Sequence, residues 1–161
     1  MLVNLQRGLV LLFLLVLAAV DYSAADELHE VRAQAAQGNA AAQFELGVRY
    51  ETAWGVPQDY AAAVRWYRKA AEQGDAHAQN SLGRMYEEGT GVPQDDVQAY
   101  KWMELAVVQL TGPARTQVEK HRAKVAAKIT PAQLAEAQRL AREWKPPPRS
   151  QDKETSDNRH L

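Results

Sequence analysis

The sequence predicts an all-α protein built as a short solenoid of antiparallel helix pairs. No stretch alternates apolar and polar residues over the length of a strand, while tyrosine, tryptophan and leucine recur at helical spacing. The chain also repeats itself after 36 residues: 18 of the 36 positions in 35–70 are identical to those in 71–106. A fixed period of this length is typical of solenoids, in which each unit buries its apolar face by stacking on its neighbours.

The first 25 residues form a pattern typical of a secretory signal peptide. One cation, Arg7, precedes the 12 apolar residues Leu9–Val20, and the small residues Ser23, Ala24 and Ala25 follow. A helix of that length is too short to cross a hydrocarbon core of ~30 Å comfortably. We expect cleavage after Ala25, no membrane span in the mature chain, and a periplasmic or secreted protein. The alternative is an uncleaved signal that anchors the chain to a membrane.

Each 36-residue unit predicts two helices. In the first helix Ala42, Leu46 and Tyr50 are four residues apart and therefore share one stripe. Gly47 costs roughly 1 kcal/mol in a helix interior relative to alanine, so its recurrence predicts a close approach of two helices. In the second helix we expect Trp66 to be the large packing residue, with alanines making room for its neighbours.

The segment Gly55–Asp59, with the sequence GVPQD, recurs at Gly91–Asp95 and predicts the joint between the two helices of a unit. Gly89 is suited to end the first helix in a left-handed conformation, and proline stops helix continuation. Asp95 is expected to cap the second helix, with Gln98 completing a capping box. Asp59 would do the same in the first unit, so the aspartates are interpreted as structural rather than catalytic.

The first unit departs from the second at this joint. Ala53 and Trp54 stand where the second unit has Gly89 and Thr90. Because alanine tolerates the left-handed conformation poorly, we expect an altered turn. Trp54 either folds back on the array or stands exposed as a contact residue for a partner.

The flanking segments predict caps for the array. Leu28, Val31 and Ala35 lie at i, i+3 and i+7 and predict a single helix before the repeats. After a break at residues 111–113, a degenerate helix pair is expected over 113–145, its first helix ending near Lys128. Its second helix is expected to begin at the cap Thr130, with Pro131 first and Gln133 completing the cap, and to bury Leu134, Ala137, Ala141 and Trp144. Residues 146–161 are rich in proline and charge and predict a disordered tail, either inert or a short docking segment.

The stretch Gln34–Val107 resembles tandem Sel1-like repeats, which are relatives of the tetratricopeptide repeat. Both units carry A-x-x-x-L-G-x-x-Y, then G-V-x-x-D, A-x-x-W and A-x-x-G in register. The resemblance implies a right-handed superhelix of helix pairs that acts as an adaptor for other proteins. Bacterial members often lie in the cell envelope, which agrees with the signal peptide inferred from the residues alone.

No pattern of residues predicts catalysis, a cofactor or a metal site. The histidines are scattered, at His29, His77, His121 and His160, without H-E-x-x-H, and no serine lies in G-x-S-x-G. The net charge of −1 lacks the basic excess typical of nucleic-acid binding. A cysteine-rich subgroup of Sel1-like proteins has been linked to β-lactam binding. This chain has no cysteine, which excludes disulfides, thiolate metal sites and lipidation at a cysteine. The resemblance therefore does not support β-lactam binding by this chain.

Positions that differ between the two units predict the partner-binding surface. One stripe on the first helices differs at every pair, Ala41/His77, Phe44/Asn80 and Val48/Arg84, and the related tetratricopeptide architecture places this stripe in its concave groove. Extended by one turn, the predicted groove residues are Phe44, Val48, Glu51, His77, Asn80, Arg84 and Glu87. A second stripe, Glu45/Ser81 and Arg49/Met85, is the alternative if the first helices turn the neighbouring row of side chains toward the groove.

Arg84 has two interpretations within this groove. It clamps a carboxylate of a partner with two parallel hydrogen bonds, or it pairs with Glu87 or Glu88 on its own helix surface.

The leading hypothesis is an exported adaptor that docks another envelope or exported protein in this groove. The alternative is an envelope hydrolase or a protein that binds cell-wall fragments or small ligands. Self-association through exposed array ends is a third option, which leaves the oligomeric state open.

Overall fold

The computed structural model describes residues 26–146. The expected signal peptide over 1–25 and the tail from residue 147 onward, His160 included, lie outside the described residues. The helices of the described part are the segment 26–36, α2 (Ala40–Thr52), α3 (Tyr60–Glu72), α4 (Ala76–Glu88), α5 (Asp96–Gln109), α6 (Gly112–Lys128) and α7 (Pro131–Glu143). No strand occurs between residues 26 and 146, and the predicted all-helical solenoid is confirmed.

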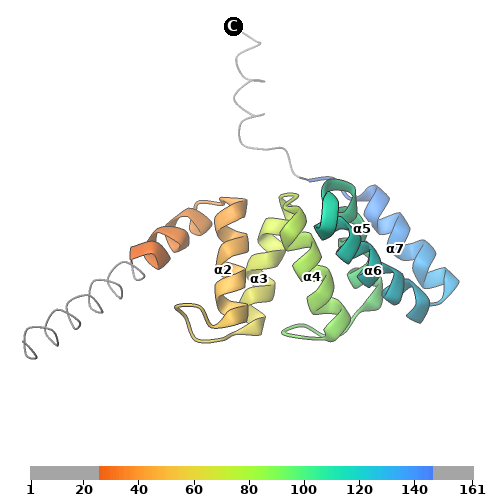
Figure 1. Ribbon diagram of the computed structural model, residues 1–161, viewed down its shortest axis with the longest axis horizontal. Coiled ribbons are helices and arrows are strands. Elements are labelled where there is room, and N and C mark those ends of the chain that lie inside the picture. Colours follow the sequence, from red (N-terminus) through yellow and green to blue (C-terminus); the bar gives the residue numbers. More distant parts are fainter. Residues whose placement is uncertain (1–25, 147–161) are drawn as a thin grey trace, which may run out of the picture.

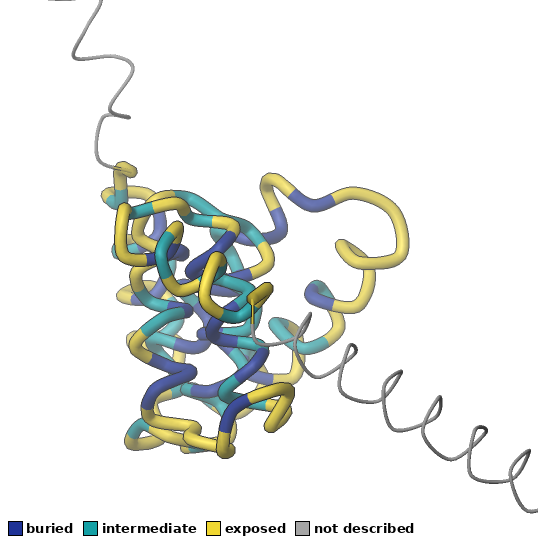
Figure 2. Tube along the Cα trace, turned by 90° about the vertical axis from the view of Figure 1, so that its left-hand side faces the viewer, coloured by how far each residue is buried: buried dark blue, intermediate teal, exposed yellow. Residues whose placement is uncertain are grey.

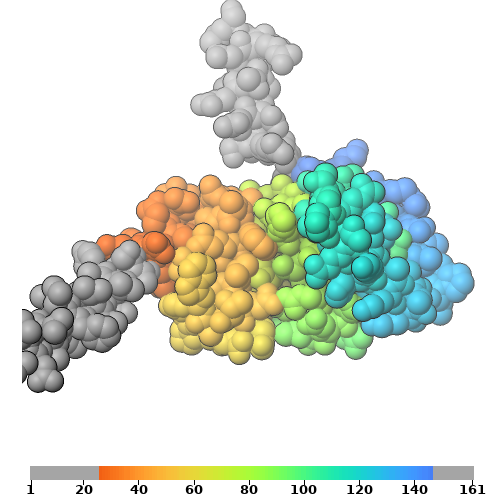
Figure 3. Space-filling view, in the orientation of Figure 1, coloured from red at the N-terminus to blue at the C-terminus, as the bar shows by residue number. Residues whose placement is uncertain are grey.

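The helices follow one another along the long axis of the molecule (Figures 1 and 3). Within each repeat the two helices pack on each other, α2 on α3 and α4 on α5, and α3 packs on α4 to join the repeats. Figure 2 shows that buried residues lie where the helices face one another, while the joints are mostly exposed. The apolar core is therefore a seam that runs the length of the array.

An acidic or amide side chain caps the start of each of the first four helices of the array, α2 to α5. Asp59 accepts a hydrogen bond from the Ala62 amide at 2.8 Å, and Asp95 accepts one from the Gln98 amide at 3.0 Å, as predicted. Asn39 and Asp75 cap α2 and α4 in the same way. The GVPQD segments are confirmed as joints between helices.

The capping box expected at Gln98 is wrong in one half. Its side chain does not return a hydrogen bond to the Asp95 amide, because that amide already donates to the Tyr86 carbonyl at 3.0 Å. The same bond, Asp59 to Tyr50, closes the first joint. The hydrogen bond that closes the joint thus occupies the aspartate amide that a capping box would need.

The expectation of an altered first turn is also wrong. Ala53 adopts the left-handed conformation, with φ 60° and ψ 27°, close to the φ 69° and ψ 25° of Gly89. The following amides bond to equivalent carbonyls, Trp54 to Arg49 at 3.0 Å and Thr90 to Met85 at 3.1 Å. The other hydrogen bonds of the joint fix this backbone conformation. Ala53 therefore adopts it in spite of the steric strain between its Cβ atom and the backbone.

The repeated helix glycines lie where two helices of a unit meet closely, as predicted. A Cβ atom at Gly47 would stand 2.5 Å from Cδ1 of Tyr67. A Cβ atom at Gly83 would stand 2.9 Å from Cγ of Met103 and 3.1 Å from the Ala99 carbonyl oxygen. Each glycine therefore makes space for a side chain of the second helix of its own unit.

The expected role of Trp66 as the large packing residue is wrong for the first unit. Trp66 is only half-buried and packs, as Leu28 and Val31 of the capping helix do, against the buried cluster that contains Ala35 and Leu46. In the described part of the chain, only a single helix covers that end of the array. Tyr67 is the buried aromatic residue there, beneath Gly47. Trp102, the counterpart in the second unit, is buried and meets Trp144 edge to face at 6.3 Å between ring centroids.

The helix 26–36 caps the first unit as predicted. Ala35 is buried with Ala42 and Leu46 of α2, and Leu28 and Val31 pack against this cluster. Gln43 also donates a side-chain hydrogen bond at 3.1 Å to the Ala35 carbonyl. The capping helix is therefore held by apolar burial and by a polar contact.

The last two helices depart from the helix pair seen in the repeats. α6 and α7 each pack against α5 and make few contacts with each other. Thr130 and Gln133 form the predicted capping box at the start of α7, with Pro131 in its first position. Of the predicted inner face, Ala137 and Ala141 are buried, and Leu134 and Trp144 are half-buried. The terminal pair is thus degenerate in packing as well as in sequence.

Candidate functional site

The seven predicted groove residues lie on α2 and α4, the first helices of the two units. Phe44, Val48 and Glu51 come from α2, and the other four, His77, Asn80, Arg84 and Glu87, come from α4. His77 is exposed and the other six are half-buried. Two contacts bring the helices together at this surface, one aromatic and one ionic.

The aromatic contact joins Phe44 to His77. Their ring centroids are 5.9 Å apart with the planes tilted by 37°. On its other side Phe44 meets the buried Tyr67 ring at 5.7 Å. Phe44 is therefore held between α3 and α4, while a part of its ring remains open to solvent. Val48 lies one helical turn further along α2, and Asn80 lies one turn beyond His77 on α4.

The ionic contact joins Arg84 to Glu51. One guanidinium nitrogen of Arg84 bonds to Glu51 Oε1 across the two units, and the other bonds to Glu88 Oε2 at 3.1 Å on the same helix. Tyr67 donates its hydroxyl to the second oxygen of Glu51 at 2.6 Å. Glu51 thus connects three helices. Of the two sequence interpretations of Arg84, the same-helix pair is present with Glu88 and absent with Glu87.

The pKa values of these groups follow from their surroundings. Burial alone would lower the pKa of Arg84, but the charge and hydrogen bond of Glu51 raise it above its ordinary value. Burial raises the pKa of Tyr67 well above its ordinary value, and the neighbouring Glu51 carboxylate raises it further. Tyr67 therefore remains a hydroxyl donor, and Arg84 remains a cation with its charge offset inside the protein.

Glu87 repeats the role of Glu51 one unit later. It is only 12% exposed and bonds to Lys128 Nζ at 3.0 Å, with His121 Nδ1 at 3.6 Å. Both partners lie on α6. The hydrogen bond and charge of Glu87 raise the pKa of Lys128. The equivalent carboxylates of Glu51 and Glu87 thus connect α2 to α4 and α4 to α6. Each connects the first helix of its unit to the next helix but one.

Sequence reasoning missed Glu51 as the partner of Arg84. The two residues are 33 positions apart, three fewer than the 36-residue repeat. In the next unit Arg84 therefore lies one helical turn before Glu87, the counterpart of Glu51. An arginine at this position was the signal in the sequence for a pair between the units. Tyr67 was missed because its counterpart is Met103, so the hydroxyl lies outside the repeated pattern.

The alternative stripe is buried in one of its two rows: Glu45 and Ser81 are half-buried, whereas Arg49 and Met85 are buried. Arg49 is 3% exposed and Met85 is fully buried. Arg49 donates two hydrogen bonds to Glu45 Oε1, at 2.9 and 2.7 Å, on its own helix. Its guanidinium carbon lies 4.2 Å from the centroid of the Trp54 ring. Trp54 is 56% exposed, so both interpretations of this residue hold in part: it folds back onto Arg49 and still presents surface.

Within residues 26–146 no group of three or more histidine, cysteine, aspartate or glutamate side chains is placed to hold a metal ion. In the same part of the chain no helix combines the length and apolarity that crossing a membrane requires.

Comparison with known proteins decides the family of the repeats. The Sel1 repeat family model matches residues 40–75 and 76–107. Residues 40–107 are two Sel1 repeats. The matches have the same 36-residue step as the predicted units 35–70 and 71–106 and start at a later point of the repeat. Sel1 repeats generally mediate protein–protein interactions, and their fold is typically a non-catalytic scaffold.

Two solved structures share this fold. A protective antigen of uropathogenic Escherichia coli with an SLR fold is 37% identical, with a TM-score of 0.67, over 73% of this chain and 24% of its own. A Sel1 repeat protein from Oxalobacter formigenes is 38% identical, with a TM-score of 0.53, over 56% of this chain and 26% of its own. This chain thus spans about a quarter of each. No curated protein matches the sequence.

Proposed function

We propose that this Sel1-repeat chain is an exported adaptor that docks another protein on the shared face of α2 and α4. The contact surface is an open patch formed by Phe44, Val48, His77 and Asn80. One observation carries the proposal: Phe44 is fixed between Tyr67 and His77, yet remains partly exposed. A rigid, partly exposed aromatic side chain is the kind of residue that dominates binding energy in protein interfaces.

The polar part of the groove has a positioning role in this proposal. Arg84 and Glu51 pair with each other, so little of their charge is left for a partner. Their bond holds α4 against α2 and thereby sets the distance between Phe44 and His77. Arg84 is then a positioning residue, and its loss changes partner binding through the shape of the patch.

Export is the second half of the proposal. The signal-like pattern of Arg7, Leu9–Val20 and Ala25 supports delivery to the periplasm or the medium of a bacterial cell. Amino-terminal sequencing of the protein recovered from the periplasm tests this half separately. A chain that begins at Asp26 supports export with cleavage. Recovery of the protein only from the cytoplasm contradicts it.

The docking half is tested by crosslinking in living cells with a photoreactive residue in place of His77, which is exposed at the edge of the patch. We expect a small set of specific crosslinked proteins. Crosslinking from position 65, an exposed residue on α3, is the matched control, and it should not yield the same set.

A second substitution ties the captured proteins to the patch. Val48→Glu places a charge on the patch; because Val48 is half-buried and packs against the core, thermal melting first establishes that the variant is folded at the temperature of the crosslinking. The specific crosslinks from position 77 should disappear. If they persist unchanged, or if positions 65 and 77 capture the same proteins, docking on this face is wrong.

A further inference from the structure

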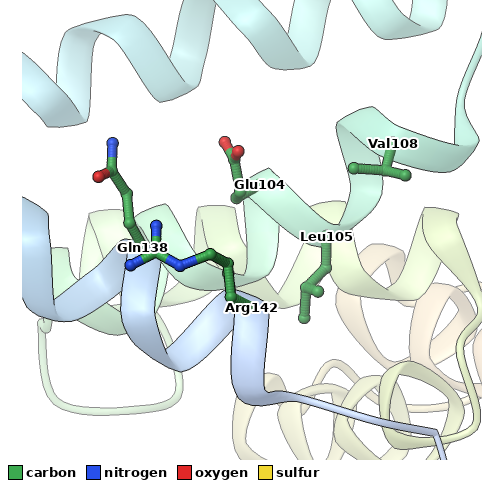
Figure 4. Close-up of a pocket in the computed structure, with 6 residues that line it drawn as sticks. Glu104, Leu105, Val108, Gln138 and Arg142 are labelled. Atoms are coloured by element: carbon green, nitrogen blue, oxygen red, sulfur yellow. The ribbon is translucent and has the colours of Figure 1, made fainter.

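A pocket of about 370 Å³ lies between α5 and α7 (Figure 4). It is lined by Glu104, Leu105, Val108, Gln138, Ala141 and Arg142. The volume falls within the range of about 300–1,000 Å³ typical of small-molecule sites. Half of its lining comes from α7, which lies beyond the two repeats, so the repeat pattern did not predict it.

The pocket follows from how the last two helices pack. α6 and α7 both rest on α5 and make few contacts with each other, which leaves the outer surface of α5 incompletely covered. Of the three α7 residues that line the pocket, the only apolar one is the small Ala141. Val108 at the rim is 77% exposed, the most exposed of the large apolar side chains in residues 26–146. Leu105 and Ala141 therefore form an apolar floor, and Val108 forms an apolar rim that opens to solvent.

The two charged residues that line the pocket, Glu104 and Arg142, differ in whether they have an ion-pair partner in the described part of the chain. The Glu104 carboxylate is held by Arg122 of α6, which offsets its charge. Arg142 has no carboxylate partner within ion-pair distance among residues 26–146. Arg139, three residues earlier on the same helix, is held between Glu136 at 2.7 Å and Glu143 at 2.5 Å. The pocket thus carries one cation that the described part of the protein leaves without a carboxylate.

Arg142 and Gln138 lie one turn apart on α7, and both line the pocket (Figure 4). A guanidinium group can bond both oxygens of a carboxylate in parallel, and the Gln138 amide offers a further donor. These donors stand beside an apolar floor large enough for an aliphatic side chain. The pocket therefore has the chemistry to recognise a carboxylate that carries a short branched aliphatic group.

We propose that this pocket binds the carboxyl-terminal residue of a partner polypeptide whose last side chain is aliphatic. Arg142 binds the terminal carboxylate, Gln138 assists, and Leu105 and Val108 receive the side chain. The exposed rim at Val108 gives the preceding residues of the peptide a path into solvent. The site lies on α5 and α7, apart from the α2 and α4 patch, so it stands or falls independently of docking there.

The first test uses the protein purified from cells that express the full chain and follows its amide resonances by NMR. N-acetyl-leucine is the probe, and N-acetyl-leucinamide, which lacks the carboxylate, is its matched control. We expect saturable shifts around Leu105 and Arg142 with a millimolar dissociation constant, and about tenfold weaker binding of the amide. Equal binding of acid and amide, or no saturable shift with the acid up to about 50 mM, would overturn the proposal.

Two arginine variants separate the site from the general charge of α7. Arg142→Gln should weaken N-acetyl-leucine binding about tenfold, because it removes the bidentate partner. Arg139→Gln removes the same charge from the same helix at a position that does not line the pocket, and it should change binding less than about twofold. Equal effects of both variants would contradict a site at Arg142.

Two further measurements test the apolar rim at Val108 and the source of the carboxylate. Val108→Gln alters an exposed side chain, so the fold is kept while N-acetyl-leucine binding should fall several-fold. An acetylated tetrapeptide ending in leucine should bind at least as tightly as N-acetyl-leucine. Tighter binding of hexanoate than of this peptide would show a free fatty acid site and overturn the assignment to a polypeptide end. Val48→Glu should leave all these affinities unchanged.

Discussion

Gln73 donates a side-chain hydrogen bond to the amide oxygen of Gln43 at 2.7 Å, across 30 residues of chain. The same bond recurs one unit later, from Gln109 to Gln79 at 3.1 Å. The acceptor glutamines are buried, and each also donates to a main-chain carbonyl, Gln43 to Ala35 and Gln79 to Ala71. Each unit therefore contains one buried amide, near the start of its first helix, that bonds both to the end of the preceding helix and to the end of the second helix of its own unit.

The first prediction concerns this buried amide. Gln79→Met keeps the side-chain length but loses two hydrogen bonds, the one to the Ala71 carbonyl, which keeps the Gly74 amide as a donor, and the one from Gln109. At about 0.5–1.5 kcal/mol for each bond, the free energy of unfolding should fall by about 1–3 kcal/mol. Urea denaturation followed by circular dichroism measures the loss. Gln37→Met, at an exposed position, should lie within about 0.5 kcal/mol of the parent protein. Similar effects at the two positions would contradict a structural role for the amide.

The second prediction concerns the left-handed Ala53. Ala53→Gly relieves the contact between Cβ and the backbone, and it should stabilise the protein by about 1 kcal/mol even after the greater flexibility of glycine in the unfolded chain is counted. Gly89→Ala, the reciprocal change in the second unit, should destabilise by a similar amount, since its φ of 69° is equally left-handed. Thermal melting of both variants checks the pair. A stabilising Gly89→Ala would refute the argument.

The third prediction concerns the close approach at Gly47. Alanine has the higher helix propensity by roughly 1 kcal/mol, but a Cβ here would stand 2.5 Å from a ring that is held by its hydroxyl bond to Glu51. Gly47→Ala should therefore destabilise by about 1–3 kcal/mol, as overpacking does. In the double variant Gly47→Ala with Tyr67→Leu, the penalty of the alanine should largely disappear, which chemical denaturation can measure as a coupling energy. A purely additive pair would rule out the contact as the cause.

The fourth prediction concerns alkaline pH. Burial and Glu51 raise the pKa of Tyr67 above its ordinary 10.0, so the unfolded chain ionises this hydroxyl at a pH where the folded protein does not. A raised pKa in the folded state gives a contribution that is complete below pH 10 and is lost progressively as the pH rises further. The free energy of unfolding should accordingly decline above pH 10.

Two variants isolate that decline. Tyr67→Phe should be less stable than the parent at neutral pH, since Glu51 loses a donor, and should lose less stability between pH 9 and about 11.5. Tyr60→Phe removes a hydroxyl from an exposed ring and serves as the control. An unchanged alkaline slope in Tyr67→Phe would show that another group is responsible.

The sequence predicted the parts of the fold that depend on neighbours within a helix or on the repeat itself. The GVPQD joints, the caps at Asp59 and Asp95 and the close approach at Gly47 and Gly83 are all local or repeated features. The prediction at Ala53 was wrong because it used only the low tendency of alanine to adopt the left-handed conformation. The other hydrogen bonds of the joint fix the backbone there and outweigh that tendency.

The contacts between units were harder to predict. Which side chains meet across α2 and α4 depends on the rotation from one unit to the next, which helical periodicity does not specify. The groove stripe was chosen by comparing Phe44 with Asn80 and Val48 with Arg84, and that comparison does not reveal that Glu51 would bond to Arg84. The pocket beside Arg142 arises where the repeat ends, so no counterpart in the sequence pointed to it.

The packing of Trp144 against Trp102 determines where the chain leaves the array. Trp144 and Pro146 lie against Gly74, at the turn between α3 and α4, with closest carbon distances of 3.8 Å from a Cβ placed on that glycine. The exit point is therefore beside the middle of the molecule rather than beyond its last helix (Figure 1). A fluorophore or fusion partner joined after residue 146 would report on the junction of the two repeats, and a stop at residue 143 would remove a tryptophan from that junction.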